Sequence, residues 1–306
     1  MVISLLLQFT LNIIKSILYA MQESAIPSFL VLCTSTLNLI YAKVAPIGSV
    51  ESNILRFSVM YLIAANLPLI ICTIWVFAKP LKFCRPNLKY FKINRAKDIM
   101  GLGGMFFVVQ VLYLLIMNTN EFLITKTQGP DKVVDYQIYY KIFSSIGMGC
   151  SLALTPIWSA VTEAIAKKDI VWIKSIIKKM TIAGCIVTVG ILLVIPSFPL
   201  ILPLWLGNRD FEINYAYLFL FALLGICLIF NGIFSNIANG LSELKTQMIC
   251  FAIGACIHMF GGIGITYALN SWIGMVLATV LAIVPYLIIQ PIVLKRIIYK
   301  IEDNNM

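Results

Sequence analysis

The sequence predicts an all-α fold, a polytopic membrane helical bundle with about nine transmembrane helices. Of the 306 residues, 60% are hydrophobic and 12% are charged, against about 25% charged residues in an ordinary soluble domain. A hydrocarbon core about 30 Å thick needs roughly 20 apolar residues per helix. Stretches such as 182–195 and 276–289 are apolar on all sides, which favours helices over the alternating strands of a membrane β-barrel.

Nine apolar stretches are long enough to be membrane spans, and short polar connections separate them. They are residues 2–20, 26–44, 54–78, 99–124, 133–160, 173–203, 214–238, 247–268 and 272–294. An odd number of spans places the two termini on opposite sides of the membrane. The longest connection is basic, so we expect three helices in 1–78, a linker at 79–98, six helices in 99–300 and a tail at 301–306.

The net charge of +10 is distributed by side of the membrane. Most Lys and Arg residues lie in the linker 79–98, in the connection around 167–179 and after the seventh and last spans. These connections fall on one side if each span crosses once, and the positive-inside rule makes that side cytoplasmic. We therefore expect a cytoplasmic C-terminus, and the distribution argues against nucleic acid as a partner.

The first and seventh spans share a short pattern. Residues 12–16 read Asn-Ile-Ile-Lys-Ser and residues 231–235 read Asn-Gly-Ile-Phe-Ser, and each span is followed by a short turn with an acid. Two interpretations remain open, an internal duplication of the kind found in many transporters and chance similarity between apolar helices. Under duplication, three helices would be missing before Met1.

The most specific motifs run from the fourth span onwards. GLGG at 101–104 opens that span, PIWSAVTEA at 156–164 closes the fifth, and LWLG at 204–207 is expected in an outside loop. This run resembles the polysaccharide and O-antigen flippases of the multidrug/oligosaccharidyl-lipid/polysaccharide exporter superfamily. The resemblance covers residues 99–210 best, and the rest of the chain by topology.

The resemblance implies a partial two-lobe (6+6) exporter fold in the bacterial inner membrane. Such proteins move polyprenyl-pyrophosphate-linked oligosaccharides between membrane leaflets by alternating access, alongside glycan polymerases and glycosyltransferases. The sequence contains neither a catalytic constellation nor a phosphate-binding loop of the G-x-x-x-x-G-K-[ST] type. We therefore expect a transporter with no enzymatic activity, no cofactor and no metal site.

Charged residues within spans are costly and are functional candidates by default. Lys141, beside Tyr139 and Tyr140, would meet the sugar or pyrophosphate in a cavity, and Arg56 and Lys15 are weaker candidates of the same kind. The alternative for each lysine is a side chain that snorkels to the interface. For Lys141 a further alternative is an ion pair with one of the two nearby acids.

Those acids, Glu121 and Asp135, are the candidates for coupling to a proton or a sodium ion, and a polar helix end is the alternative for Glu121. The single histidine, His258, lies in the middle of a span and fits a hydrogen-bonded packing role better than a proton relay. Small residues four apart, Ser145 with Gly149 and Gly147 with Ser151, would allow close helix contact.

Two other functions stay open. A drug or cation exporter of the same superfamily would use the same fold, although the basic excess suits an anionic cargo better. A non-transporting product, either a truncated remnant or an assembly partner of a glycan export system, would explain a layout of three plus six spans.

Overall fold

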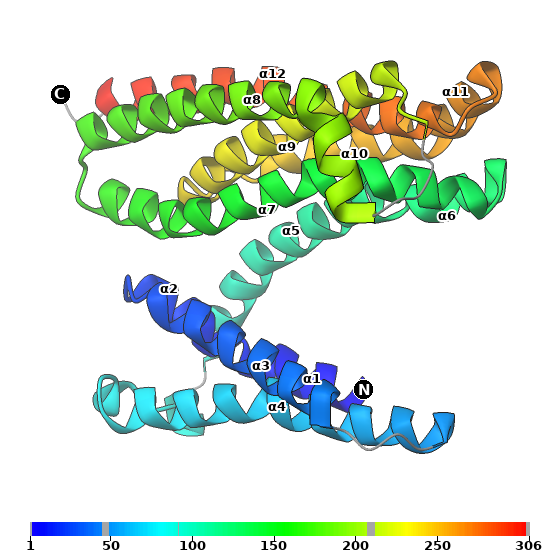
Figure 1. Cartoon of the computed structure of the whole chain (residues 1–306). Helices are drawn as coiled ribbons and strands as arrows, with labels where there is room; N and C mark the ends of the chain where they lie inside the picture. Colours follow the sequence, from blue (N-terminus) through cyan, green and yellow to red (C-terminus); the bar gives the residue numbers. More distant parts are fainter. Residues whose placement is uncertain (1, 45–48, 91, 207–211, 304–306) are drawn as a thin grey trace. The chain divides into compact units, whose positions relative to one another are not determined.

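The computed structural model describes residues 2–44, 49–90, 92–206 and 212–303. Throughout these ranges the regular structure is helical and includes no strand, so the predicted all-α class is confirmed. The helices, shown in Figure 1, are α1 (Val2–Leu11), α2 (Ile13–Ala20), α3 (Ala25–Val44), α4 (Val50–Ala78), α5 (Ile93–Asn118), α6 (Asn120–Gln128), α7 (Asp131–Ala166), α8 (Ile170–Leu206), α9 (Tyr215–Gly240), α10 (Lys245–Cys256), α11 (Gly262–Leu269) and α12 (Ile273–Asp303), with short 3-10 turns at Lys82–Cys84 and Leu88–Tyr90.

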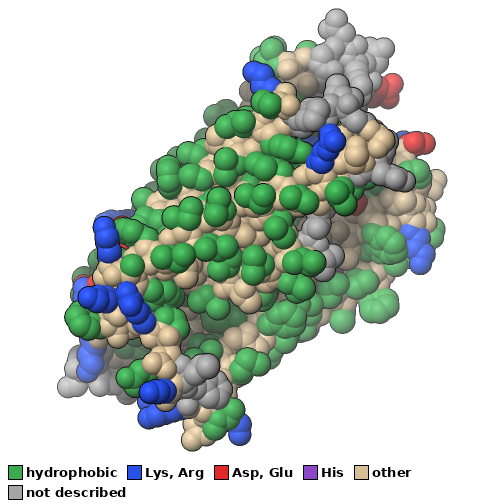
Figure 2. Space-filling model, turned by 90° about the horizontal axis from the view of Figure 1, so that it is seen from below, with side chains coloured by type: hydrophobic (Ala, Val, Ile, Leu, Met, Phe, Trp, Pro, Cys, Tyr) green, Lys and Arg blue, Asp and Glu red, His purple; other side chains and the backbone are tan. Residues whose placement is uncertain are grey.

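Among the described residues, eight helical segments are long and apolar enough to cross a membrane. The sequence predicted about nine, and the remaining one, 133–160, falls in α7, a more polar helix with Asp131, Lys132, Asp135 and Lys141 in its first turns. Hydrophobic side chains cover most of the face in Figure 2, and Lys and Arg lie towards its ends. The chain is therefore a multi-pass helical membrane protein.

Three predicted spans are interrupted helices. The first breaks at Asn12 between α1 and α2, and the fourth breaks at Thr119 between α5 and α6. The eighth contains a π-helical segment, Ile257–Gly261, between α10 and α11. At the second and third breaks, polar side chains contact other helices, which hydrophobicity alone does not predict.

The chain separates into two units, Met1–Ile93 and Asn94–Met306, and the boundary lies in the predicted linker. Within the first unit, α1 and α3 pack against α4. The Asn66 side-chain nitrogen on α4 donates to the Ser4 hydroxyl of α1 at 3.0 Å, and both side chains are buried. This polar contact fixes α1 against α4 within the apolar unit.

The second unit is built around α9, which packs against α7, α8 and α12. In turn, α12 packs against α10, α11 and the π-helical segment. Buried side chains from these helices form one large hydrophobic core. Because α9 lies in the middle of this core, its few polar side chains must find partners or line a cavity inside the unit.

Four helix ends close with the same turn. Gln22, Lys168, Ser242 and Asn270 adopt a left-handed conformation (φ 63°, 58°, 56° and 46°). The N–H of the residue that follows each of them donates to a carbonyl five residues earlier, the pattern of a Schellman cap. The turns at Gln22 and Ser242 agree with a duplication of the first and seventh spans, but the turn at Lys168 shows that this chain uses the motif elsewhere.

One predicted loop is helical. Leu204, Trp205 and Leu206 of the LWLG motif are the last residues of α8, so the motif ends a helix, and its Gly207 lies outside the described residues. Pro196, Pro199 and Pro203 all lie inside α8, so none of them ends the helix before the motif. Neighbouring groups re-satisfy freed carbonyls in membrane helices, which makes such prolines tolerable.

Close helix contact occurs at glycines other than those in the small-residue pattern. Nothing lies within 4 Å of a Cβ built on Gly147 or Gly149, so the contact that these small residues would allow is absent among the described atoms. Instead, a Cβ on Gly254 of α10 would lie 2.5 Å from the carbonyl oxygen of Ala282 on α12. The spacing of small residues is thus insufficient, because the partner helix must also lie on that face.

Replacing Gly254 by Ala should lower the free energy of unfolding by about 1–3 kcal/mol, because the new methyl group overpacks the contact with α12. Gly264→Ala is the matched control, since nothing lies within 4 Å of a Cβ there and Ala favours a helix over Gly. The measurement is thermal unfolding of the purified protein in detergent. Equal midpoints for the two variants would contradict the close packing of α10 on α12.

Candidate functional site

A row of polar side chains runs along the buried helix α9. Asn231, Ser235 and Asn239 are four residues apart and therefore share one face of the helix. Asn231 is 5% exposed although its neighbours in sequence are apolar. Burying an amide costs free energy unless it is hydrogen-bonded, so this row is the least expected feature of an otherwise apolar helix.

The row opens into a cavity of about 470 Å³ within the second unit, which we call the amide cavity. Helices α5, α7, α9 and α10 supply its walls. Its polar lining consists of Gln110, Tyr113, Asn231, Ser235, Asn239 and Gln247, and its aromatic lining consists of Phe106, Phe107, Trp158 and Phe251. The described lining is electrically neutral, and it offers amide and hydroxyl groups beside aromatic rings.

Most polar groups of the amide cavity are already paired with each other. Gln247 Nε2 donates to Asn239 Oδ1 at 2.9 Å, and the Ser235 hydroxyl lies 3.1 Å from the Tyr286 hydroxyl. The Asn231 Oδ1 atom is buried and has no partner among the described residues, although other atoms of this residue line the cavity.

Aromatic pairs form the rest of the wall. The rings of Phe106 on α5 and Trp158 on α7 stack with their centroids 5.2 Å apart. The ring centroids of Tyr113 on α5 and Phe251 on α10 lie 5.5 Å apart. These pairs connect α5 to α7 and α10, and therefore set the width of the cavity.

A buried hydrogen-bond network anchors the far end of α5. His258 Nε2 lies 3.1 Å from the Thr119 hydroxyl at the junction of α5 and α6. The Thr279 hydroxyl of α12 donates to Asn120 Oδ1 at 3.1 Å and lies 3.3 Å from His258 Nδ1. The network joins the two irregular points of the unit, the α5–α6 break and the π-helical segment.

The interpretation of His258 as a hydrogen-bonded packing residue is therefore confirmed. Its side chain is fully buried, and both ring nitrogens lie within hydrogen-bonding distance of threonine hydroxyls. The π-helical segment that carries it adds one residue to a helical turn, a feature that is frequent at functional sites.

The structure does not gather the charged candidates into one site. Lys141 is exposed on α7 and lines none of the cavities described here. The two acids near Lys141 in the sequence contact other residues. Gln137 Nε2 donates to Glu121, and Lys132 Nζ lies 3.5 Å from Asp135 Oδ2. The expected alternative of an ion pair for Lys141 is therefore absent from the described contacts.

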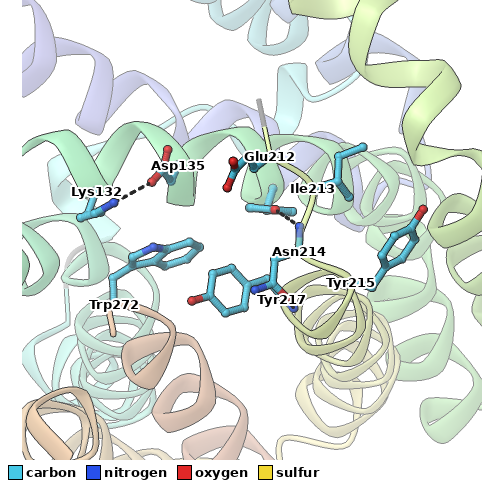
Figure 3. Close-up of a pocket in the computed structure, with 9 residues that line it drawn as sticks. Lys132, Asp135, Glu212, Ile213, Asn214, Tyr215, Tyr217 and Trp272 are labelled. Atoms are coloured by element: carbon cyan, nitrogen blue, oxygen red, sulfur yellow. Dashed lines mark hydrogen bonds and ion pairs between the residues drawn. The ribbon is translucent and has the colours of Figure 1, made fainter. Parts of the chain in front are cut away.

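Two of the candidates line a second cavity of about 570 Å³, formed by the ends of α7, α9 and α12. Asp135 lies there beside Lys132, with Glu212 nearby and with Tyr217 and Trp272 in the wall (Figure 3). Tyr139 lines it too, but its ring is buried. Its hydroxyl accepts a hydrogen bond from the Asn214 N–H at 3.1 Å, which attaches the start of α9 to α7.

The other three candidates are not among the lining residues of these two cavities. Tyr140 is half-buried and stacks on Tyr136 with centroids 5.3 Å apart. In the first unit, Arg56 is exposed on α4, and Lys15 is half-buried on α2. The cavity roles of these residues stay predictions.

Sequence reasoning missed the amide cavity as a site. Asn231 and Ser235 served only as signs of a duplication, and Gln110 was one polar residue among several in its span. The four-residue spacing of Asn231, Ser235 and Asn239 was the available signal. It indicates a polar helix face, but the helix that faces it is visible only in the structure.

Comparison of the chain with protein-family models, with curated proteins and with solved structures found no match in any of the three. The resemblance to glycan flippases is therefore an expectation from short motifs. The functional argument depends on the cavities and on the residues that line them.

Replacing Thr279 by Val should lower the free energy of unfolding by about 1–2 kcal/mol, because Asn120 and His258 lose a buried partner. Thr188→Val on α8 is the matched control, since that hydroxyl bonds to the Gly184 carbonyl of its own helix. Unfolding is followed by circular dichroism during an SDS titration in mixed micelles. Equal losses in the two variants would show that the network does not hold the α5–α6 junction.

Proposed function

We propose that the chain is part of a membrane translocase that moves a lipid-linked oligosaccharide across the bacterial inner membrane. The observation that carries the proposal is the amide cavity, a neutral and polar space inside an apolar helical unit. Amide and hydroxyl groups that line a cavity inside an apolar helical unit favour a polar cargo over a purely structural role. The motifs that resemble glycan flippases add to this argument.

The lining of the amide cavity suits a neutral polyhydroxylated cargo. Amide groups at Asn231, Asn239 and Gln247 can both donate hydrogen bonds to sugar hydroxyls and accept hydrogen bonds from them. The faces of aromatic rings such as Trp158 cover the apolar faces of sugar rings. A positively charged drug would instead favour a carboxylate, and the described lining supplies none. The chemistry thus favours a glycan over cationic drugs.

The charged candidates keep separate roles in this proposal. Lys141 is exposed and enters no ion pair among the described contacts, so its ammonium group is available to the pyrophosphate of the cargo. Glu121, bonded to Gln137, and Asp135, paired with Lys132, are candidates for an ion or proton site. Alternating access would expose the cargo first on one side of the membrane and then on the other.

Replacing Asn231 by Leu should reduce surface glycan about fivefold to tenfold, because it removes a neutral hydrogen bond worth about 1–1.5 kcal/mol to the cargo. The assay is complementation of a glycan-flippase-null strain by the chain, expressed both as given and with the coding region upstream of it. Asn236→Leu is the matched control, since Asn236 is on α9 but bonds to the Gly232 carbonyl of its own helix. Membrane abundance of each variant is measured by immunoblot.

Three outcomes separate the alternatives. Rescue that Asn231→Leu impairs and Asn236→Leu does not impair supports a glycan cargo in the amide cavity. Rescue that survives both substitutions contradicts a role for the cavity. The absence of rescue by either unmodified form, with both present in the membrane, favours drug export or a non-transporting product.

A further inference from the structure

A third cavity, of about 340 Å³, lies between α8 and α12 at the C-terminal end of α12, and we call it the lysine pocket. Its walls include the apolar side chains of Ile177, Phe234 and Leu294. Lys174, Lys295 and Tyr299 also line it. The pocket is therefore apolar with cationic groups in its lining, unlike the neutral amide cavity.

The two lysines of the pocket differ in whether an acid pairs with them. Lys174 Nζ lies 2.7 Å from a carboxylate oxygen of Glu302 and 5.2 Å from the centroid of the Tyr299 ring. Lys295 is exposed and takes part in no ion pair among the described residues. Lys295 thus carries a charge that Glu302 does not offset.

The position of the pocket matches a membrane interface. Lys295 directly follows the apolar stretch 272–294, and a span of about 20 apolar residues reaches from one interface to the other. The side chains of Ile177 and Leu294 lie on the helices that carry Lys174 and Lys295, so apolar and cationic groups occur together. A ligand that fits both parts has an anionic group next to an apolar chain.

We propose that the lysine pocket binds an anionic phospholipid, with its phosphate at Lys295 and Lys174 and part of an acyl chain against Phe234 and Leu294. Basic pockets between transmembrane helices bind the headgroups of anionic lipids. A free phosphate would leave the apolar wall uncovered, and a zwitterionic lipid would bring a cation next to the lysines. The ligand class is therefore a phospholipid with a net negative headgroup, such as phosphatidylglycerol.

Because Lys174 pairs with Glu302, the proposal predicts opposite changes in lipid affinity for substitutions of Lys295 and of Glu302. Lys295→Gln should weaken binding of dioleoylphosphatidylglycerol about fivefold, since a basic residue near an anionic lipid is worth about 1 kcal/mol. Glu302→Gln should strengthen binding about twofold to fivefold, because it frees Lys174 and removes a negative charge. Lys178→Gln should leave affinity nearly unchanged, since Lys178 is exposed on α8 and is not part of the lining.

The measurement is native mass spectrometry of the full chain released from detergent, titrated separately with dioleoylphosphatidylglycerol, dioleoylphosphatidylcholine and glycerol phosphate. The proposal holds if only the anionic lipid binds tightly, and if its affinity falls in Lys295→Gln, rises in Glu302→Gln and is unchanged in Lys178→Gln. Equal binding of the two lipids, or equal weakening by Lys178→Gln, would overturn it in favour of general hydrophobic or electrostatic attraction. Saturation of the same site by glycerol phosphate alone would overturn the lipid as the source of the phosphate. None of these readouts depends on glycan transport.

Discussion

The structure of the second unit depends on one constraint, that a polar group away from water must find its partner within the protein. The backbone meets it by forming helices almost everywhere among the described residues. The side chains of α9 meet it in pairs, through Ser235 with Tyr286 and Asn239 with Gln247. The Oδ1 atom of Asn231 is an exception, as are Thr266 Oγ1 and the side-chain amide of Gln290, since each is buried without a partner among the described residues. Of these residues, Asn231 lines the one neutral polar cavity described in the unit.

The same constraint explains how far the fold could be predicted. A run of about 20 apolar residues becomes a helix in hydrocarbon regardless of its neighbours, so the positions of the spans follow from hydrophobicity. The breaks in the spans have another origin. The helix break at Thr119 contacts His258 of the π-helical segment, and His258 contacts Thr279. No local pattern in the sequence indicates these contacts between distant segments.

The candidate site was harder to predict for a related reason. A charge within a span is conspicuous in a sequence, so Lys141 attracted attention, whereas neutral amides such as Asn231 and Gln247 are not conspicuous. Whether any of them lines a cavity depends on how the helices pack. Gly254 and Gly149 illustrate the same point, because a Cβ on Gly254 would meet α12 and a Cβ on Gly149 would meet nothing within 4 Å.

The amide cavity and the lysine pocket share one helix. Phe234 lines the lysine pocket and the next residue, Ser235, lines the amide cavity, so α9 contributes to both. The hydrogen bond between Ser235 and Tyr286 links that face to α12, the helix that carries Lys295. If a ligand in one cavity changes the affinity of the other cavity, linkage requires the two ligands to change each other's affinity by the same factor. A lipid bound between α8 and α12 would then act on the cargo site through these helices alone, without touching the cargo.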